Sequence, residues 1–103
     1  MLKRKLMPEP ETEAELKREC TKILKQVGYM VHSTSDGRMS HNSRGTADSY
    51  VGDMIKRVWR AIDYKTKTGK LSPEQSLLVE FGLLNIVRST DDLYELIYEW
   101  NGK

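Results

Sequence analysis

The sequence has few of the residues that several large protein classes need. Its single cysteine, Cys20, excludes an internal disulfide, and its two histidines, nine residues apart, form no zinc-ligand cluster. No apolar run approaches the ~18 residues of a membrane-spanning helix, because Glu80 and Asn85 interrupt the longest one. The basic N-terminus has no apolar stretch behind it and does not resemble a secretory signal. We therefore expect a small soluble protein of a reducing compartment, with no membrane partner.

Length and composition favour one folded domain. The chain has 103 residues, of which 38% are hydrophobic and 31% charged. This is enough for one small core of about three to five short elements, but not for a second core. Residues 1–9 have the composition of a flexible basic arm, so we expect the domain to span residues 10–103.

The small net charge of +2 hides a gradient along the chain. Residues 1–70 carry a net charge of +6, and residues 71–103 carry a net charge of −4. Such a separation suits an anionic partner on one face of the molecule. Uneven surface charge also arises by chance, so the gradient alone leaves both interpretations open.

Two segments show the signals of amphipathic helices with N-terminal caps. Thr12 and Glu15 fit a capping box, apolar residues follow at helical spacing, and Gly28 is placed to end the helix. Ser72 and Gln75 fit a second capping box, and an apolar side is expected behind it. The apolar residues expected to face inward are Leu16, Cys20, Ile23, Leu24 and Val27 in the first helix, and Leu77, Leu78, Phe81 and Leu84 in the second.

The remaining segments predict a hairpin, two further strands and a last helix. The hairpin turn is expected at Gly52 and Asp53, and the polar run at residues 33–45 predicts a long loop. The order helix, three strands, helix, strand, helix predicts a small α/β domain with a mixed sheet. Strands are expected at residues 29–32, 48–51, 56–65 and 85–88, and the last helix at 90–100 with Leu93, Leu96, Ile97 and Trp100 inward.

Asp63 and Lys65 form an acid-x-Lys triplet on the longest predicted strand. Two residues apart on a strand, their side chains leave the same face, and Asp48 on the neighbouring strand can converge on them. Paired carboxylates hold Mg²⁺ through oxygen ligands, and a nearby lysine can orient water or stabilise charge on a phosphate. Such triplets also arise by chance, as Glu15-Leu16-Lys17 illustrates, so an ordinary surface ion pair is the alternative.

Four ordered segments contain or flank this triplet. They are Arg44-Gly45-Thr46-Ala47-Asp48, Ile62-Asp63-Tyr64-Lys65, the run from Gly69 to Gln75, and Ile86-Val87-Arg88-Ser89. Together they resemble the VRR-NUC domain, the virus-type replication-repair nuclease branch of the PD-(D/E)xK superfamily. The resemblance runs from about residue 13 to residue 92, and the run at 69–75 is its most specific part.

The sequence departs from the family pattern at two positions. Ala47 stands where the family usually has proline, and Asp63 stands where glutamate is usual. The proline shapes the backbone and binds nothing, and aspartate keeps the negative charge of the ligand. Neither change predicts an inactive enzyme.

The resemblance implies a restriction-endonuclease-like core and a Mg²⁺ site in which Mn²⁺ would substitute. It implies Asp48, Asp63 and the backbone carbonyl of Tyr64 as metal ligands, and Lys65 as a catalytic residue. It also implies an acidic ligand on the first helix.

Two further residues are candidates for the same site. Glu13 and Glu15 both qualify as the acid of the first helix, and we favour Glu13 because the capping box accounts for Glu15. Gln75 could reach the metal site or the substrate, and its alternative role is the capping box with Ser72. These two roles of Gln75 are compatible.

Basic residues bracket the proposed site and could contact phosphates. Their alternative role is that of ordinary solvated loop charges. A second candidate patch lies on the hairpin, beside Trp59, which we expect to be a core or interface residue rather than a base-stacking platform. The phosphate-binding candidates are Arg38, Arg44, Lys67 and Lys70, and the second patch comprises Lys56, Arg57 and Arg60.

Stand-alone members of this family cut four-way junctions as homodimers. The resemblance therefore implies a metal-dependent, structure-specific DNA endonuclease, namely a four-way (Holliday) junction resolvase that acts as a homodimer and needs no small-molecule cofactor. It implies the cytoplasm of a bacterial or phage-infected cell. The alternatives are a flap-type or non-specific DNA nuclease, or a catalytically silent nucleic-acid binding module of the same fold.

Overall fold

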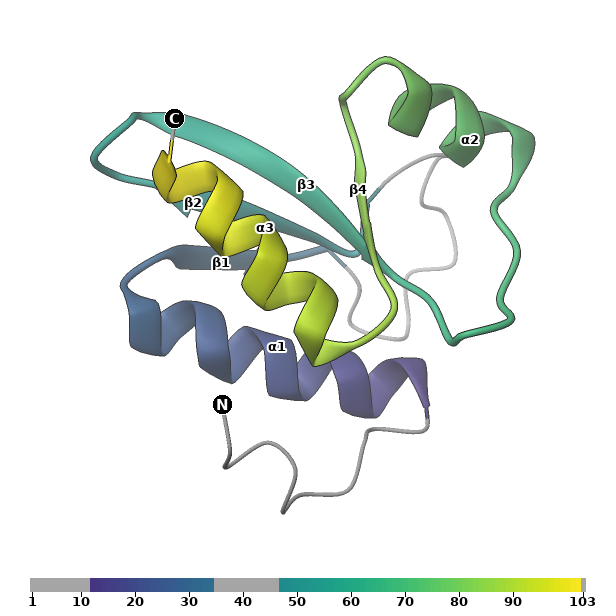
Figure 1. Ribbon diagram of the computed structural model, residues 1–103, viewed down its shortest axis with the longest axis horizontal. Coiled ribbons are helices and arrows are strands. Elements are labelled where there is room, and N and C mark those ends of the chain that lie inside the picture. The colour runs from purple at the N-terminus through teal and green to yellow at the C-terminus, as the bar shows by residue number, and fades with distance from the viewer. Residues whose placement is uncertain (1–11, 35–46, 103) are drawn as a thin grey trace.

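Three helices and four strands follow one another along residues 12–34 and 47–102, the part of the chain that the computed structural model describes (Figure 1). Their order is the predicted one. The basic arm expected at residues 1–9 lies outside the described residues. No described helix combines the length and the apolarity needed to cross a membrane. The elements are α1 (Glu13–Val27), β1 (Met30–Ser33), β2 (Ser49–Asp53), β3 (Val58–Tyr64), α2 (Pro73–Glu80), β4 (Asn85–Val87) and α3 (Thr90–Gly102).

The four strands form one mixed sheet in the order β1-β2-β3-β4. β1 pairs with β2 and β2 with β3 in antiparallel fashion, whereas β3 and β4 are parallel. A parallel pair needs a crossover connection, and here the crossover contains α2. The prediction of a small α/β domain with a mixed sheet is confirmed.

Both ends of α1 follow from local sequence. The Thr12 side chain accepts a hydrogen bond from the Glu15 amide, and the Glu15 side chain accepts one from the Thr12 amide. Gly28 ends the helix in the left-handed conformation, with φ of 113°, and donates its amide to the carbonyls of Leu24 and Lys25. The predicted capping box and C-terminal glycine are therefore confirmed.

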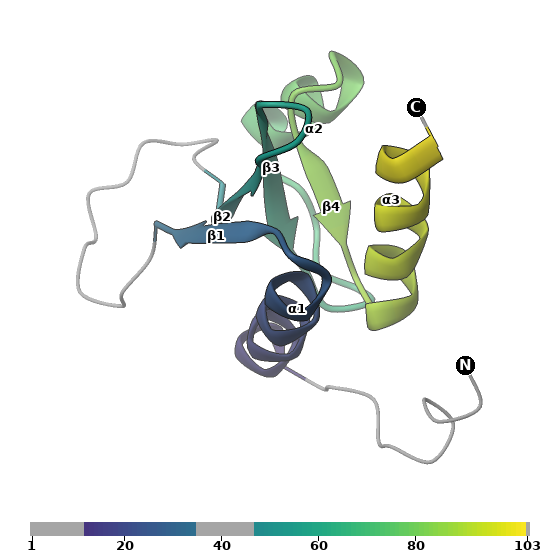
Figure 2. The ribbon, with the colours of Figure 1, turned by 90° about the vertical axis from the view of Figure 1, so that its left-hand side faces the viewer.

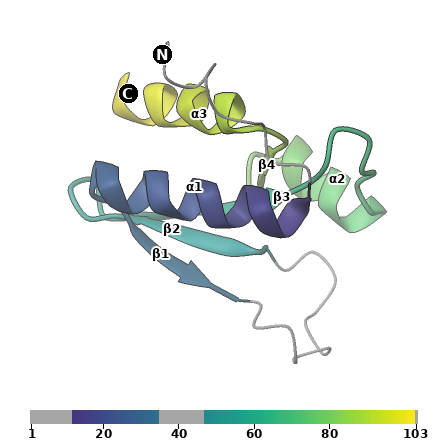
Figure 3. The ribbon, with the colours of Figure 1, turned by 90° about the horizontal axis from the view of Figure 1, so that it is seen from below.

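The hydrophobic core lies between the sheet and the helices α1 and α3, which cover the same face (Figures 2 and 3). The inward residues predicted for α3 are confirmed, because Leu93, Ile97 and Trp100 are buried and Leu96 packs partly against them. In α1 the predicted stripe is confirmed except at Val27, which is exposed. The buried core residues are Leu16, Cys20, Leu24, Val51, Ile62, Tyr64, Val87, Leu93, Ile97 and Trp100.

The hairpin turn lies later than predicted. Gly52 and Asp53 belong to β2, and residues 54–57 form the turn. The Asp53 carboxylate makes this turn, because its Oδ1 accepts the amides of Ile55 and Lys56. Gly52 serves packing instead, since a Cβ atom there would lie 3.1 Å from the ring of Trp59. Trp59 itself is 61% exposed, so it is not a core residue, and the other expectation for it, a place in an interface, stays a prediction.

The helix α2 stands apart from α1 and α3, on the right of Figure 1. Its predicted capping box is present, with the Ser72 hydroxyl accepting the Gln75 amide. The predicted inward apolar side is wrong, because α2 contains no buried residue and Leu77 and Phe81 are exposed. The other two helices already cover the core, and only Leu84, beyond the end of α2, is buried as expected.

Candidate active site

Asp48 and Asp63 lie side by side where β2 begins and β3 ends. The register pairs Ser49 with Ile62, which brings the preceding Asp48 next to Asp63. The Asp48 amide donates to Asp63 Oδ1 at 3.2 Å, and Asp48 Oδ2 accepts the Tyr64 amide at 2.9 Å. The structure thus brings together two carboxylates that lie 15 residues apart in the sequence.

The Asp63 carboxylate is buried, with 4% of the residue exposed. Burial, and after it the negative charge of Asp48, raise its pKa from 3.8 to about 6. The positive charge of Lys65 acts in the opposite direction. A buried carboxylate beside a second one is electrostatically unfavourable, so a cation placed against both would be stabilised.

Lys65 reaches the same carboxylate. Its ammonium Nζ lies 3.7 Å from Asp63 Oδ2, and its side chain is mostly buried. The two side chains therefore leave the same face of the strand, as their spacing predicts. The backbone of Lys65 is fixed as well, because its amide donates to the Val87 carbonyl of β4.

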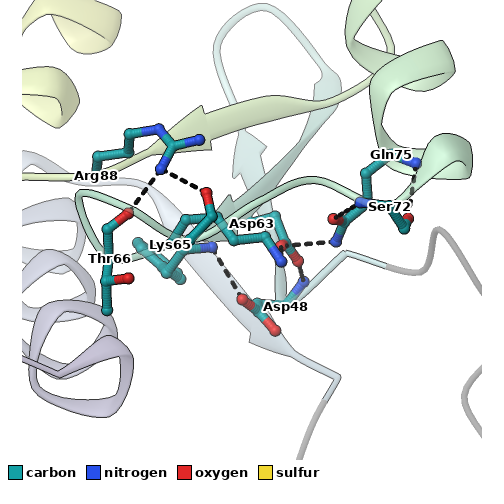
Figure 4. A network of polar contacts seen from close by, with 9 residues as sticks. Asp48, Asp63, Lys65, Thr66, Ser72, Gln75 and Arg88 are labelled. Carbon is teal, nitrogen blue, oxygen red and sulfur yellow. Dashed lines mark hydrogen bonds and ion pairs between the residues drawn. The ribbon is translucent and has the colours of Figure 1, made fainter.

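Gln75 joins the site from the first turn of α2 (Figure 4). Its Nε2 donates to Asp63 Oδ2 at 2.9 Å, while its Oε1 accepts the Ser72 amide at 3.1 Å. One side chain therefore closes the capping box and contacts the acidic pair. The capping-box role of Gln75 is confirmed, and its contact with Asp63 is compatible with the predicted role at the site, which stays a prediction.

The acidic pair has the chemistry of a Mg²⁺ site. Asp48 and Asp63 supply oxygen atoms, the ligands that Mg²⁺ prefers, and one or two protein carboxylates with several waters suffice for it. Among residues 12–34 and 47–102, no group of three or more acidic, histidine or cysteine side chains lies closely enough to hold a metal. Glu13 is exposed on α1, and its role as a ligand stays a prediction, as does that of the Tyr64 carbonyl.

The predicted phosphate-binding residues fall into two groups. Lys67 and Lys70 are exposed on the loop between β3 and α2, next to the acidic pair in sequence. Arg38 and Arg44 lie outside the described residues. The phosphate contacts of all four residues stay predictions.

Two of the three residues of the second basic patch, on the hairpin, are engaged within the protein. Arg60 forms an ion pair with Asp53 at 3.0 Å and lies over the Trp100 ring, 4.7 Å from its centroid. The Lys56 ammonium donates to the Trp100 carbonyl. These contacts hold the hairpin against α3 and leave Lys56 and Arg60 poor candidates for phosphate binding, whereas Arg57 is exposed and its phosphate contact stays a prediction.

Two residues that position the backbone of the site, Thr34 and Arg88, make contacts that are not apparent from the sequence. The Thr34 amide donates to the Asp48 carbonyl at 3.0 Å and its hydroxyl to the Ala47 carbonyl at 2.5 Å, which fixes the backbone at Asp48. Arg88 contacts the loop after Lys65. Arg88 ends the strand predicted at residues 85–88, but the sequence does not indicate its partners, which are 19 to 22 residues away.

No family model, curated protein or solved structure matches the chain.

Proposed function

We propose that the protein is a metal-dependent, structure-specific DNA endonuclease that hydrolyses phosphodiester bonds. The observation that carries this proposal is the convergence of Asp48, Asp63 and Lys65 on adjacent strands. A paired carboxylate site with a lysine against it is what metal-assisted phosphodiester hydrolysis requires. The alternative of a solvated surface ion pair fits less well, because Asp63 is buried.

Each side chain has a part in the proposed reaction. Asp48 and Asp63 would hold the cation, and Gln75 and the Asp48 amide would fix the orientation of the Asp63 carboxylate. Bound Mg²⁺ lowers the pKa of water and stabilises negative charge on the phosphate. Lys65 is placed to orient the attacking water or to stabilise charge that develops on the phosphate.

The resemblance to VRR-NUC nucleases directs the proposal towards four-way junctions. The element order and mixed sheet are compatible with a restriction-endonuclease-like core. A two-fold homodimer would present two sites to a two-fold junction, so that opposing strands are nicked symmetrically. We propose that the enzyme acts in this form, in the cytoplasm of a bacterial or phage-infected cell.

The proposed dimer needs an apolar surface, and the last helix does not supply it. Leu93, Ile97 and Trp100 of α3 are buried within the protomer. Exposed apolar side chains lie instead on two segments, the β2–β3 hairpin with Ile55 and Trp59, and α2 with the turn after it. We propose the second segment for the interface, and its exposed apolar residues are Leu77, Val79, Phe81 and Leu83.

The test is cleavage of labelled four-way junction, flap and plain duplex DNA with Mg²⁺ or Mn²⁺. We expect metal-dependent cutting of the junction, with a loss of ~100-fold or more in Asp63→Asn and Lys65→Ala. The chain offers a matched control in its other acid-x-Lys triplet, so Lys17→Ala should cut at the wild-type rate. Equal loss in Lys17→Ala and Lys65→Ala would refute the assignment of Lys65.

The pattern of substrates separates the alternatives. Preference for flaps, or equal cutting of all three DNAs, would indicate a flap-type or non-specific nuclease that uses the same site. Binding of the junction without cutting in either metal would indicate the catalytically silent module and would refute the enzymatic proposal.

A further inference from the structure

The Arg88 side chain connects the end of β4 to the loop between β3 and α2. Its Nη1 donates to three backbone carbonyls of that loop, those of Thr66 at 2.6 Å, Lys67 at 3.2 Å and Gly69 at 2.8 Å. Figure 4 shows the guanidinium above the loop, on the side of Lys65 away from Gln75. One nitrogen thus contacts three of the four backbone carbonyls of residues 66–69.

The backbone of Arg88 is itself held on both sides. Its amide donates to Asp92 Oδ2 at 2.9 Å, in the first turn of α3. The residue before it, Val87, pairs with Tyr64 in the sheet, and its carbonyl accepts the Lys65 amide. The guanidinium therefore extends from a fixed point and can hold the loop in one conformation.

The loop conformation matters for the site because the loop joins two of its residues. Lys65 enters the loop from β3, and Gln75 lies just beyond it in α2. Since α2 has no buried residue, packing in the core does not anchor it. Near its start, α2 is held by the hydrogen bond between Gln75 and Asp63 and by the loop that Arg88 contacts.

From this arrangement, and resting on the proposed nuclease function, we propose that Arg88 is a positioning residue. It sets the loop at residues 66–69 so that Lys65 and Gln75 meet the Asp63 carboxylate together. It acts through backbone carbonyls and does not touch the substrate. Its loss should slow the chemical step, and the guanidinium itself should add nothing to DNA binding.

The test compares Arg88→Met and Arg88→Lys with the wild type in single-turnover cleavage of the four-way junction. We expect Arg88→Met to lower the rate constant by ~10- to 100-fold, the scale at which misplaced catalytic groups act. Arg88→Lys should recover part of the rate, since an ammonium has three donors for the three carbonyls. Arg18→Met, at an exposed position of α1, controls for the loss of an arginine.

Junction affinity, measured with Ca²⁺ in place of Mg²⁺ and in a Lys67→Met, Lys70→Met background, separates positioning from phosphate binding by Arg88 itself. A positioning residue leaves the dissociation constant within about 3-fold and the salt dependence unchanged. A phosphate contact would weaken binding and reduce the slope of log affinity against log salt by about 1. That second outcome would overturn the proposal.

Cleavage by trypsin measures how firmly the loop is held, and this measurement does not depend on nuclease activity. Lys67 and Lys70 are exposed within or beside the loop, so we expect several-fold faster cleavage after them in Arg88→Met than in Arg18→Met. Unchanged cleavage, or a wild-type rate on DNA, would overturn the role of Arg88 and leave the nuclease proposal standing. A wild type that cuts no DNA would refute the nuclease proposal and this role with it. If Arg88→Met fails to fold, the cleavage rate, the junction affinity and the trypsin cleavage of Arg88→Lys test the proposal in its place.

Discussion

Asp63 lies in surroundings that disfavour its charged form. Burial and the charge of Asp48 raise its pKa to about 6, and the charge of Lys65 and the Asp48 amide only partly oppose them. Because the ordinary pKa is 3.8, the folded protein holds this proton over a pH range in which the unfolded chain has lost it. The corresponding stability is fully present below pH 3.8 and is lost as the pH rises through about 6.

This difference in pKa predicts a measurable effect of Asp63→Asn on stability. Without divalent cations, the free energy of unfolding of the wild type should fall relative to that of the variant between pH 4 and pH 7, by up to ~3 kcal/mol. Urea unfolding at several pH values measures it. Glu80→Gln, at an exposed acid, controls for the loss of one negative charge. A difference between wild type and Asp63→Asn that does not vary with pH would contradict the prediction.

At the residue scale, the sequence could predict the groups that carry chemistry but not those that position them. Asp63 and Lys65 share a strand face because side chains alternate, and this needs no tertiary information. Thr34 and Arg88 act on backbone carbonyls 13 to 22 residues away. Any polar residue can make such bonds, so residue type and spacing do not reveal them.

At the scale of the element, the two capped helices differ in what supports them. Both α1 and α2 begin with complete capping boxes, formed by Thr12 with Glu15 and by Ser72 with Gln75. Only α1 also has a buried face, whereas α2 is eight residues long and has none. Local signals therefore predicted where both helices begin, but the packing of α2 depended on which face the rest of the chain had already covered.

This contrast predicts different effects of removing the two caps. Thr12→Ala should lower the global free energy of unfolding by ~1 kcal/mol, because α1 is part of the core. Ser72→Ala should leave global unfolding almost unchanged and loosen α2 alone. Urea unfolding gives the first quantity, and chymotrypsin cleavage after Leu77 and Phe81 gives the second. Equal global losses in the two variants would show that α2 is integrated into the core.

The hairpin shows why turn positions are hard to predict from composition. Gly52 and Asp53 are typical turn residues, yet Gly52 makes room for the Trp59 ring and Asp53 binds the amides that follow it. The turn at residues 54–57 contains Arg57 with φ of 62°, a conformation rare for residues other than glycine. Side-chain bonds to the backbone outweighed the intrinsic preference of the residues in that turn.

At the scale of the whole molecule, the charge gradient of the sequence is only partly kept in space. The basic helix α1 contacts the acidic α3, which carries Asp91 and Asp92 in its first turn. At the site itself, Lys67 and Lys70 are exposed on the loop between β3 and α2. These two charges favour the approach of an anionic substrate from the side of the loop.

The proposed homodimer gives a prediction at the same scale. If α2 forms the interface, Phe81→Ser should shift the protein to the monomer, because Phe81 is 68% exposed and its burial would favour association. Light scattering after size-exclusion chromatography measures the mass, with 11.9 kDa expected for the monomer. Tyr98→Ser, at an 81% exposed aromatic residue of α3, is the matched control. A dimer that survives Phe81→Ser would place the interface elsewhere.

The lack of buried residues in α2 has a consequence for regulation. A helix with no buried residue depends strongly on its polar contacts, and one of these is to Asp63. If a cation binds at Asp63, that binding and the ordering of α2 are thermodynamically linked, and such coupling is reciprocal. A second protomer that orders α2 would therefore change the affinity of the site for its cation. Assembly and cation binding would in this way act on each other through Gln75.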